Sequence, residues 1–173
     1  MALDKLTVER IAKMHPKVRE EVLEMYSYVN EKLLGKGVRL RFAYTTRTKQ
    51  EQTDLYALGR TKKGSKVTNA QWYQTFHFES YGLAFDIVLL YDLDDNGTFE
   101  TASWDMKKDF DNDKIADWME VTNYFKTKGW EWGGDWKFKD APHFQKVFNN
   151  KWQDLKLKYD NKEFVDGTQY VKI

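Results

Sequence analysis

The stretch LAFDIVLLY, residues 83–91, decides the fold of this chain. It is a nearly continuous apolar run, which predicts a strand covered on both faces at the centre of a sheet. Its one charged residue is Asp86. A carboxylate inside such a strand costs free energy unless it is paired or bound to a metal. We therefore predict a chemical role for Asp86.

The segments around this run predict helices and further strands. Residues 38–44, VRLRFAY, alternate as in a half-buried strand. Helices are predicted from Pro16 towards Gly35, from Thr48 to Gly59, over residues 115–128 and over residues 149–159, and a loop entering a strand over residues 140–144. Because no βαβ rhythm appears, we expect an α+β fold, a single small domain over residues 1–173 with a central, mainly antiparallel sheet and flanking helices.

The composition narrows the class of partner. The 173 residues include 28 Lys and Arg against 27 Asp and Glu, a net charge of +1. This balance gives no electrostatic footprint for nucleic acid or an anionic membrane, and no apolar run is long enough to span a bilayer. The first residues, Met1 to Thr7, lack the apolar stretch of a signal peptide. We expect a monomer that binds neither nucleic acid nor membrane.

The chain contains no cysteine, so any metal must be held by histidines and carboxylates. Of the three histidines, His15 precedes Pro16 and is predicted to lead into a helix. The other two, His77 and His143, form with Asp86 the two-His, one-carboxylate set typical of catalytic zinc, which leaves a fourth position for water. Asp140 could move a proton to and from that water. The spacing alone allows equally two hydrogen-bonded histidines and a salt-bridged aspartate.

Several segments together resemble a known family. They are His15-Pro16, TTRTKQEQTDLYALGRTKKG (45–64), VTNA (67–70), QTFH (74–77), YGLAFD (81–86), WGGDW (132–136) and DAPHF (140–144). In this order they resemble the M15 peptidases, and most of all the L-alanyl-D-glutamate endopeptidases found as phage endolysins and in some bacteria. The resemblance implies the D-Ala-D-Ala carboxypeptidase/Hedgehog-like fold.

The resemblance also implies roles for individual residues. The zinc ligands fall on His77, Asp86 and His143, and the catalytic carboxylate falls on Asp140. Arg47 falls on the family's substrate-binding arginine, and its fork of donors suits a carboxylate or a developing oxyanion. The implied activity is hydrolysis of peptidoglycan stem peptides at the L-alanyl-D-glutamate bond by a zinc metallopeptidase.

The segment around His77 departs from the family pattern Ser-x-His-x-x-Gly-x-Ala-x-Asp, because two extra residues separate His77 from Gly82. Aligned without a gap from Asp86, the ligand position would hold Glu79. We favour His77, because Thr75 keeps the hydroxyl and two residues are easily looped out as a turn or bulge. Glu79 is the competing ligand, since zinc also accepts carboxylates.

Two acidic loops suggest calcium as a further cofactor. Residues 92–97 resemble the start of an EF-hand loop, but Ser103 stands where glutamate is expected. The loop that starts at Asp109 has Glu120 at its twelfth position, but Lys114 replaces the usual glycine. These loops resemble the calcium-responsive acidic loop that some endolysins of the M15 family carry. The alternative is two solvated acidic turns.

The sequence thus predicts a cell-wall lytic enzyme of the endolysin type. A D,D-carboxypeptidase acting on terminal D-alanine is the nearest alternative, and a non-catalytic wall-binding or virion protein on the same fold is an alternative from another class. The region after Phe144 is too short for a separate wall-binding domain. Without a signal peptide, we expect the protein to stay in the cytoplasm until it is released to act on the cell wall.

Overall fold

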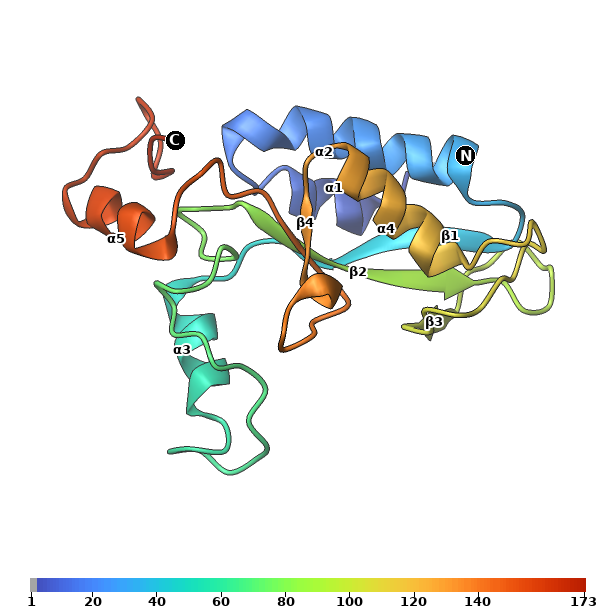
Figure 1. Ribbon diagram of the computed structural model, residues 1–173, viewed down its shortest axis with the longest axis horizontal. Helices are drawn as coiled ribbons and strands as arrows, with labels where there is room; N and C mark the ends of the chain where they lie inside the picture. The colour runs from blue at the N-terminus through green and yellow to red at the C-terminus, as the bar shows by residue number, and fades with distance from the viewer. Residues whose placement is uncertain (1–2) are drawn as a thin grey trace.

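The strand β2 (Ala84–Tyr91) is the centre of the fold in the computed structural model, which describes residues 3–173 (Figure 1). On one side, β2 pairs with β1 (Val38–Tyr44). On the other side, it pairs with β5 (His143–Gln145) near its beginning and with β3 (Thr101–Ser103) near its end. The strand β4 (Glu131–Trp132) adds to the outer side of β5. All four pairings are antiparallel, which confirms the predicted fold class.

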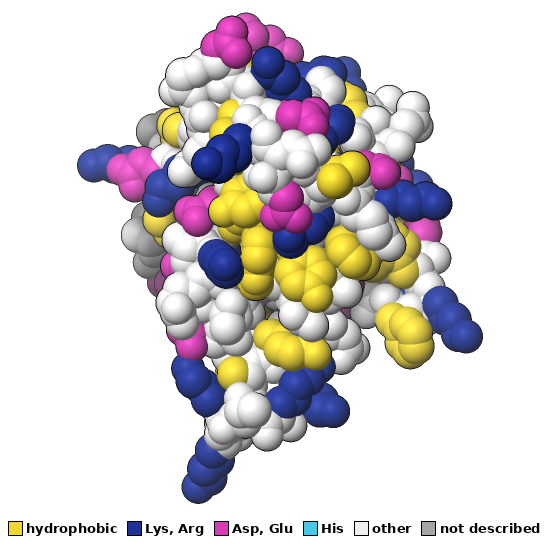
Figure 2. All heavy atoms as spheres, turned by 90° about the vertical axis from the view of Figure 1, so that its left-hand side faces the viewer, with side chains coloured by type: hydrophobic (Ala, Val, Ile, Leu, Met, Phe, Trp, Pro, Cys, Tyr) yellow, Lys and Arg dark blue, Asp and Glu magenta, His cyan; other side chains and the backbone are white. Residues whose placement is uncertain are grey.

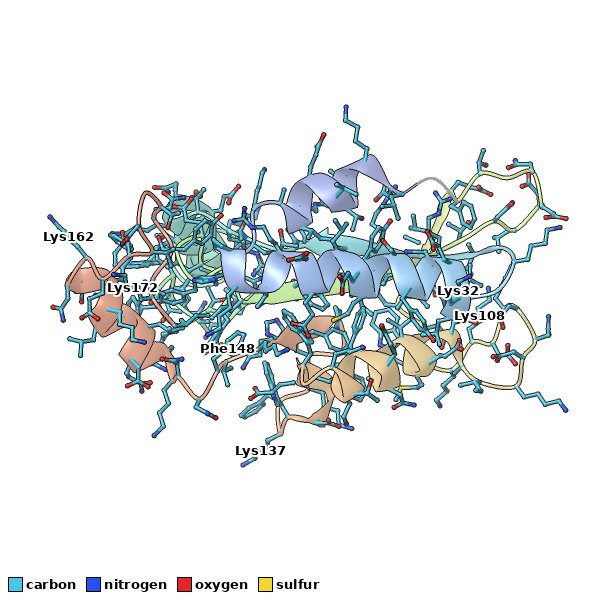
Figure 3. The ribbon with its side chains drawn as sticks, turned by 90° about the horizontal axis from the view of Figure 1, so that it is seen from above. Lys32, Lys108, Lys137, Phe148, Lys162 and Lys172 are labelled. Atoms are coloured by element: carbon cyan, nitrogen blue, oxygen red, sulfur yellow. The ribbon has the colours of Figure 1, made fainter. Side chains whose placement is uncertain are left out.

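Helices cover one face of this sheet. These are α1 (Lys5–Ile11), α2 (Pro16–Tyr28) and α4 (Asp117–Thr127), which Figure 1 shows above the sheet and Figure 3 shows from outside, with α2 and α4 side by side. A π-helical turn, Val29–Leu33, extends α2, so the helix predicted from Pro16 ends just before Gly35. No helix within residues 3–173 is long and apolar enough to cross a membrane.

Aromatic rings fill the space between the helices and the sheet. Phe85 of β2 stacks on Phe42 and Phe144 from the neighbouring strands, with ring centroids 4.4 and 5.5 Å apart. Phe125 of α4 meets Phe85 edge-on at 5.4 Å. Since successive side chains of a strand point to opposite faces, Phe85 faces the helices and Asp86 faces away from them.

The two remaining α-helices lie elsewhere, and a short 3-10 helix, Gly133–Asp135, follows β4. Helix α3 (Lys49–Ala57) projects from the opposite side of the sheet, and α5 (Trp152–Asp160) lies at one end (Figure 1). A capping box between Thr48 and Glu51 begins α3, as predicted. Figure 2 views this end of the molecule and shows apolar side chains gathered at its centre among lysines and arginines. The helices α1, α2 and α4 leave the other face of the sheet open. On that face, residues of α3 and of the loop before β5 line a cleft.

The buried His15 has a structural role, as predicted. Its Nδ1 accepts a hydrogen bond from the backbone N–H of Lys17 at the start of α2, and its Nε2 contacts the carbonyl of Val171 at 2.9 Å. This histidine therefore joins the beginning of α2 to the C-terminal segment.

Candidate metal centre and active-site cleft

Strand register brings the first two predicted ligands together. Asp86 of β2 lies directly opposite His143 of β5 in the antiparallel pair. Directly opposed residues of neighbouring strands point to the same face of the sheet. Both side chains therefore emerge on the face that the core helices leave open.

The third predicted ligand, His77, arrives on the segment between α3 and β2. The backbone N–H of Arg47 donates to the carbonyl of His77 at 2.7 Å, and the N–H of Glu79 donates to the carbonyl of Arg47 at 2.9 Å. After this short ladder, the chain turns tightly towards Gly82, which has a φ of +59°. A Cβ on Gly82 would lie 2.6 Å from the backbone nitrogen of His15. The two extra residues are thus held in a compact turn that leaves His77 facing Asp86.

Three side-chain atoms of this set face one another at short distances. His77 Nε2 lies 3.1 Å from Asp86 Oδ1 and 3.0 Å from His143 Nδ1. His143 Nδ1 lies 3.2 Å from the same carboxylate oxygen. His77, Asp86 and His143 therefore form a group able to hold a metal ion.

A hydrogen bond at the far side of the His77 ring indicates which of its two nitrogens carries the proton. His77 Nδ1 lies 2.6 Å from the backbone carbonyl of Thr45, which can only accept, so Nδ1 is the protonated nitrogen. Burial lowers the pKa of His77, so its ring is neutral and Nε2 presents a lone pair. Burial acts to raise the pKa of Asp86, but the contacts with His77 and His143 outweigh it and hold that pKa well below its usual range. A lone pair and an ionised carboxylate thus converge where a cation would lie.

Arg47, the predicted substrate-binding residue, lies beside this group. Its Nη2 donates to Asp86 Oδ2 at 3.0 Å, and its Nη1 lies 3.3 Å from Oε1 of the buried Gln52 on α3. Arg47 Nε is buried and has no hydrogen-bond partner among the described residues. The guanidinium is therefore fixed in direction, beside the cleft that Arg47 lines.

Asp140 lines the same cleft as the three candidate ligands and Arg47, a cavity of about 780 Å³. Its backbone packs against Gly133, where a Cβ would lie 2.4 Å from the Asp140 carbonyl oxygen, so this loop needs a glycine. Burial raises the pKa of Asp140, and the nearby Asp86 adds to this effect while His143 opposes it. A carboxylate of raised basicity is suited to accept a proton.

Glu79, the competing ligand, is not in this group. The residues able to share one metal here are His77, Asp86 and His143, and Glu79 belongs to none of the candidate metal groups found within residues 3–173. Its neighbour Phe78 is buried against the aromatic core, with its ring 5.0 Å from that of Tyr81. The Glu79 carboxylate is therefore not among the atoms that converge with Asp86.

The structure adds residues that the sequence analysis did not select. Gln145 lies 3.0 Å from His143 Nε2, and the Trp136 ring packs against the His143 ring with centroids 5.1 Å apart. Tyr44 stands opposite Asp86 in the sheet and its ring lies under the Arg47 guanidinium at 5.1 Å. The positions of Gln145 and Tyr44 at the site depend on strand register, which cannot be read from the sequence. Trp136, however, lies within the quoted segment WGGDW and could have been selected.

The two acidic loops also bring carboxylates together. Asp92, Asp94 and Glu100 form one group able to hold an ion, and Asp109, Asp111 and Asp117 form another. In each loop the first aspartate accepts hydrogen bonds from the fifth and sixth backbone N–H groups. Lys114 adopts a φ of +79°, close to the +86° of Gly97 at the same loop position. The lysine that departs from the EF-hand pattern therefore does not change the turn.

Known proteins resemble this chain over the region that contains the site. Residues 68–146 match the M15 peptidase family model described as D-alanyl-D-alanine carboxypeptidase. This region includes His77, Asp86, Asp140 and His143. Arg47 lies outside the range of the family model.

A curated protein is also similar to this chain. The chain is 40% identical over 116 residues to the peptidoglycan L-alanyl-D-glutamate endopeptidase CwlK of Bacillus subtilis (strain 168). The alignment covers 66% of this chain and 65% of the relative, slightly less than two thirds of the relative's length. The match supports the expected resemblance to endopeptidases of this type.

Proposed function

We propose that this protein is a zinc metallopeptidase of the bacterial cell wall, with His77, Asp86 and His143 as the zinc ligands. Zinc bonds of about 2.0–2.1 Å in a tetrahedron place the ligand atoms about 3.3 Å apart. The three candidate atoms lie 3.0–3.2 Å apart. Two neutral imidazoles with one carboxylate are also a typical set for catalytic zinc. The convergence of these three acceptors is the observation that carries the proposal.

The residues around this centre suit amide hydrolysis. A bound zinc would polarise the scissile carbonyl and acidify a water. Asp140 accepts the proton of the attacking water and returns it to the leaving amine, for which its raised pKa is suitable. Arg47, held by Asp86 and Gln52, lines the cleft, where its guanidinium would bind a substrate carboxylate or the developing oxyanion.

We propose the L-alanyl-D-glutamate bond of the peptidoglycan stem as the substrate. The similarity to an endopeptidase of that specificity supports this bond, whereas the description of the matching family model names a carboxypeptidase acting on D-alanine. The same cleft is lined by the candidate ligands and by Leu55 and Leu58 of the α3 region. Action as a released endolysin is part of the same proposal.

Mass analysis of digested peptidoglycan tests the choice of bond. We expect fragments with a new D-glutamyl amino terminus, because hydrolysis of the bond between the L-alanyl carbonyl and the D-glutamyl nitrogen frees that group. Loss of a terminal D-alanine alone would indicate the carboxypeptidase. Binding to purified cell wall without released fragments would indicate a non-catalytic protein and would contradict the proposal.

We further propose that the acidic loops bind calcium. Both place acidic oxygens from their first, third and ninth positions together, as an EF-hand loop does. Glu120, at the twelfth position of the second loop, has a buried Oε2 with no hydrogen-bond partner among the described residues. Burial, together with the nearby aspartates, raises the pKa of Glu120 to about 7. A cation in the loop would partner this oxygen and relieve the repulsion.

Thermal unfolding with and without calcium tests this proposal. At a calcium concentration of about 100 Kd the folded state gains roughly 2.7 kcal/mol, which corresponds to an increase in Tm of at least ~5 °C for a chain of this size. Glu120→Gln should reduce the increase, whereas Glu31→Gln, at an exposed position outside the loops, should not. The increase should shrink below pH 7, because protonation of Glu120 competes with calcium. An unchanged Tm would contradict the proposal.

A further inference from the structure

Gln145 connects the candidate metal centre to the edge of the sheet. Its Oε1 lies 3.0 Å from His143 Nε2, and its Nε2 donates to Glu131 Oε2 at 3.0 Å. Glu131 of β4 stands directly opposite Gln145 of β5 in the antiparallel pair. The two-residue strand β4 therefore places a carboxylate beside the amide that contacts His143.

The chemistry of these three groups fixes the direction of both hydrogen bonds. A carboxylate can only accept, so Glu131 draws the NH₂ group of Gln145 towards itself. The amide oxygen of Gln145 must then face His143, where it can only accept. The proton of the His143 ring is consequently held on Nε2. The lone pair of Nδ1 is left free to point at His77 and Asp86.

We propose that Gln145, oriented by Glu131, is a positioning residue that selects the His143 tautomer able to bind the metal. This inference rests on the metal site of the proposed function. It adds that His143 binds through Nδ1 whereas His77 binds through Nε2, and that each ring is held by an acceptor at its other nitrogen. Such outer partners set the orientation and basicity of a histidine ligand.

Two measurements on Gln145→Leu test the inference, and neither depends on hydrolysis. Replacing an outer partner of a metal-bound histidine typically weakens the metal affinity about 10- to 100-fold, and we expect such a loss in zinc affinity, measured by competition with a chelator. In the metal-free protein, two-bond ¹H–¹⁵N correlations should show the Nε2–H tautomer of His143 in the wild type and a mixture of tautomers in the variant. Gln153→Leu, at an exposed position on α5, serves as the matched control.

A polarity swap separates positioning from a structural role of the β4–β5 pair. In Glu131→Gln/Gln145→Glu the new carboxylate at position 145 accepts from His143 and from the new amide at position 131. We expect this double variant to recover most of the zinc affinity that Gln145→Leu loses, together with the Nε2–H tautomer.

Three results would overturn the inference: an Nδ1–H tautomer in the wild type, an unchanged tautomer and zinc affinity in Gln145→Leu, or a swap variant that recovers neither. If the wild type bound no zinc, the proposed metal site would fail, but the tautomer spectra would still decide the role of Gln145.

Discussion

Asp140→Ala is expected to lower the rate of stem-peptide hydrolysis about 10²- to 10⁴-fold, the usual contribution of a general acid–base residue. Zinc content should stay at the wild-type value, because Asp140 is not among the three residues that converge as ligands. Release of fragments from purified peptidoglycan measures the rate, and metal analysis of the same sample measures the zinc.

Asp135→Ala is the matched control, since Asp135 lies in the same loop, is half-exposed and pairs with Lys126. This variant should remain active. An Asp140→Ala enzyme with wild-type activity would contradict the assigned role, as would an inactive enzyme that had lost its zinc.

The pH dependence gives a second test of Asp140. A general base must be deprotonated, so the rate falls as pH drops through its pKa. Burial raises the pKa of Asp140 above that of an ordinary aspartate. The fall of kcat/KM on the acid side should therefore occur at a higher pH than an unperturbed aspartate would give. The residual kcat/KM of Asp140→Ala should not show this fall.

His77→Ala is expected to remove the metal and the activity together. Loss of a residue that hydrogen-bonds to a metal ligand weakens metal affinity by up to about 100-fold. Loss of the ligand itself should weaken zinc affinity by more than this. Glu79→Ala should bind zinc as the wild type does, because Glu79 lies outside the converging group. Chelator competition and metal analysis on both variants measure the difference.

The pair of variants decides between the two alignments of the segment before Gly82. Zinc lost in Glu79→Ala and kept in His77→Ala would show that the carboxylate is the ligand. Circular dichroism of both metal-free proteins serves as the check that each variant folds, since His77 is buried.

Much of the fold could be predicted from local patterns. The apolar run over residues 83–91 became the central strand β2, and the alternating residues 38–44 became β1. The capping box at Thr48 and the proline at position 16 begin helices where they were expected. These signals are local because they depend on side-chain periodicity and on hydrogen bonds within a few residues.

The short strands were harder to predict. The strands β3, β4 and β5 contain three, two and three residues, which is too few to show a period. The strands β3 and β5 form because β2 offers unpaired backbone groups along its second side, and β4 pairs in turn with β5. Only β5 was anticipated, from the loop that leads into it.

The sequence by itself determined the chemical inventory of this protein. Without cysteine, a metal must rely on histidines and carboxylates, and one carboxylate, Asp86, lies inside an apolar strand whose burial demands a partner. These facts follow from residue type and local pattern alone.

Only the tertiary structure decided how those residues meet. The register between β2 and β5 sets His143 opposite Asp86, and the turn before Gly82 places His77, but not Glu79, in the converging group. Strand β4 supplies Glu131, which orients Gln145 towards His143. The physical reason is that strand register and turn geometry depend on contacts between residues far apart in the chain, where a shift by one residue would move each side chain to the other face.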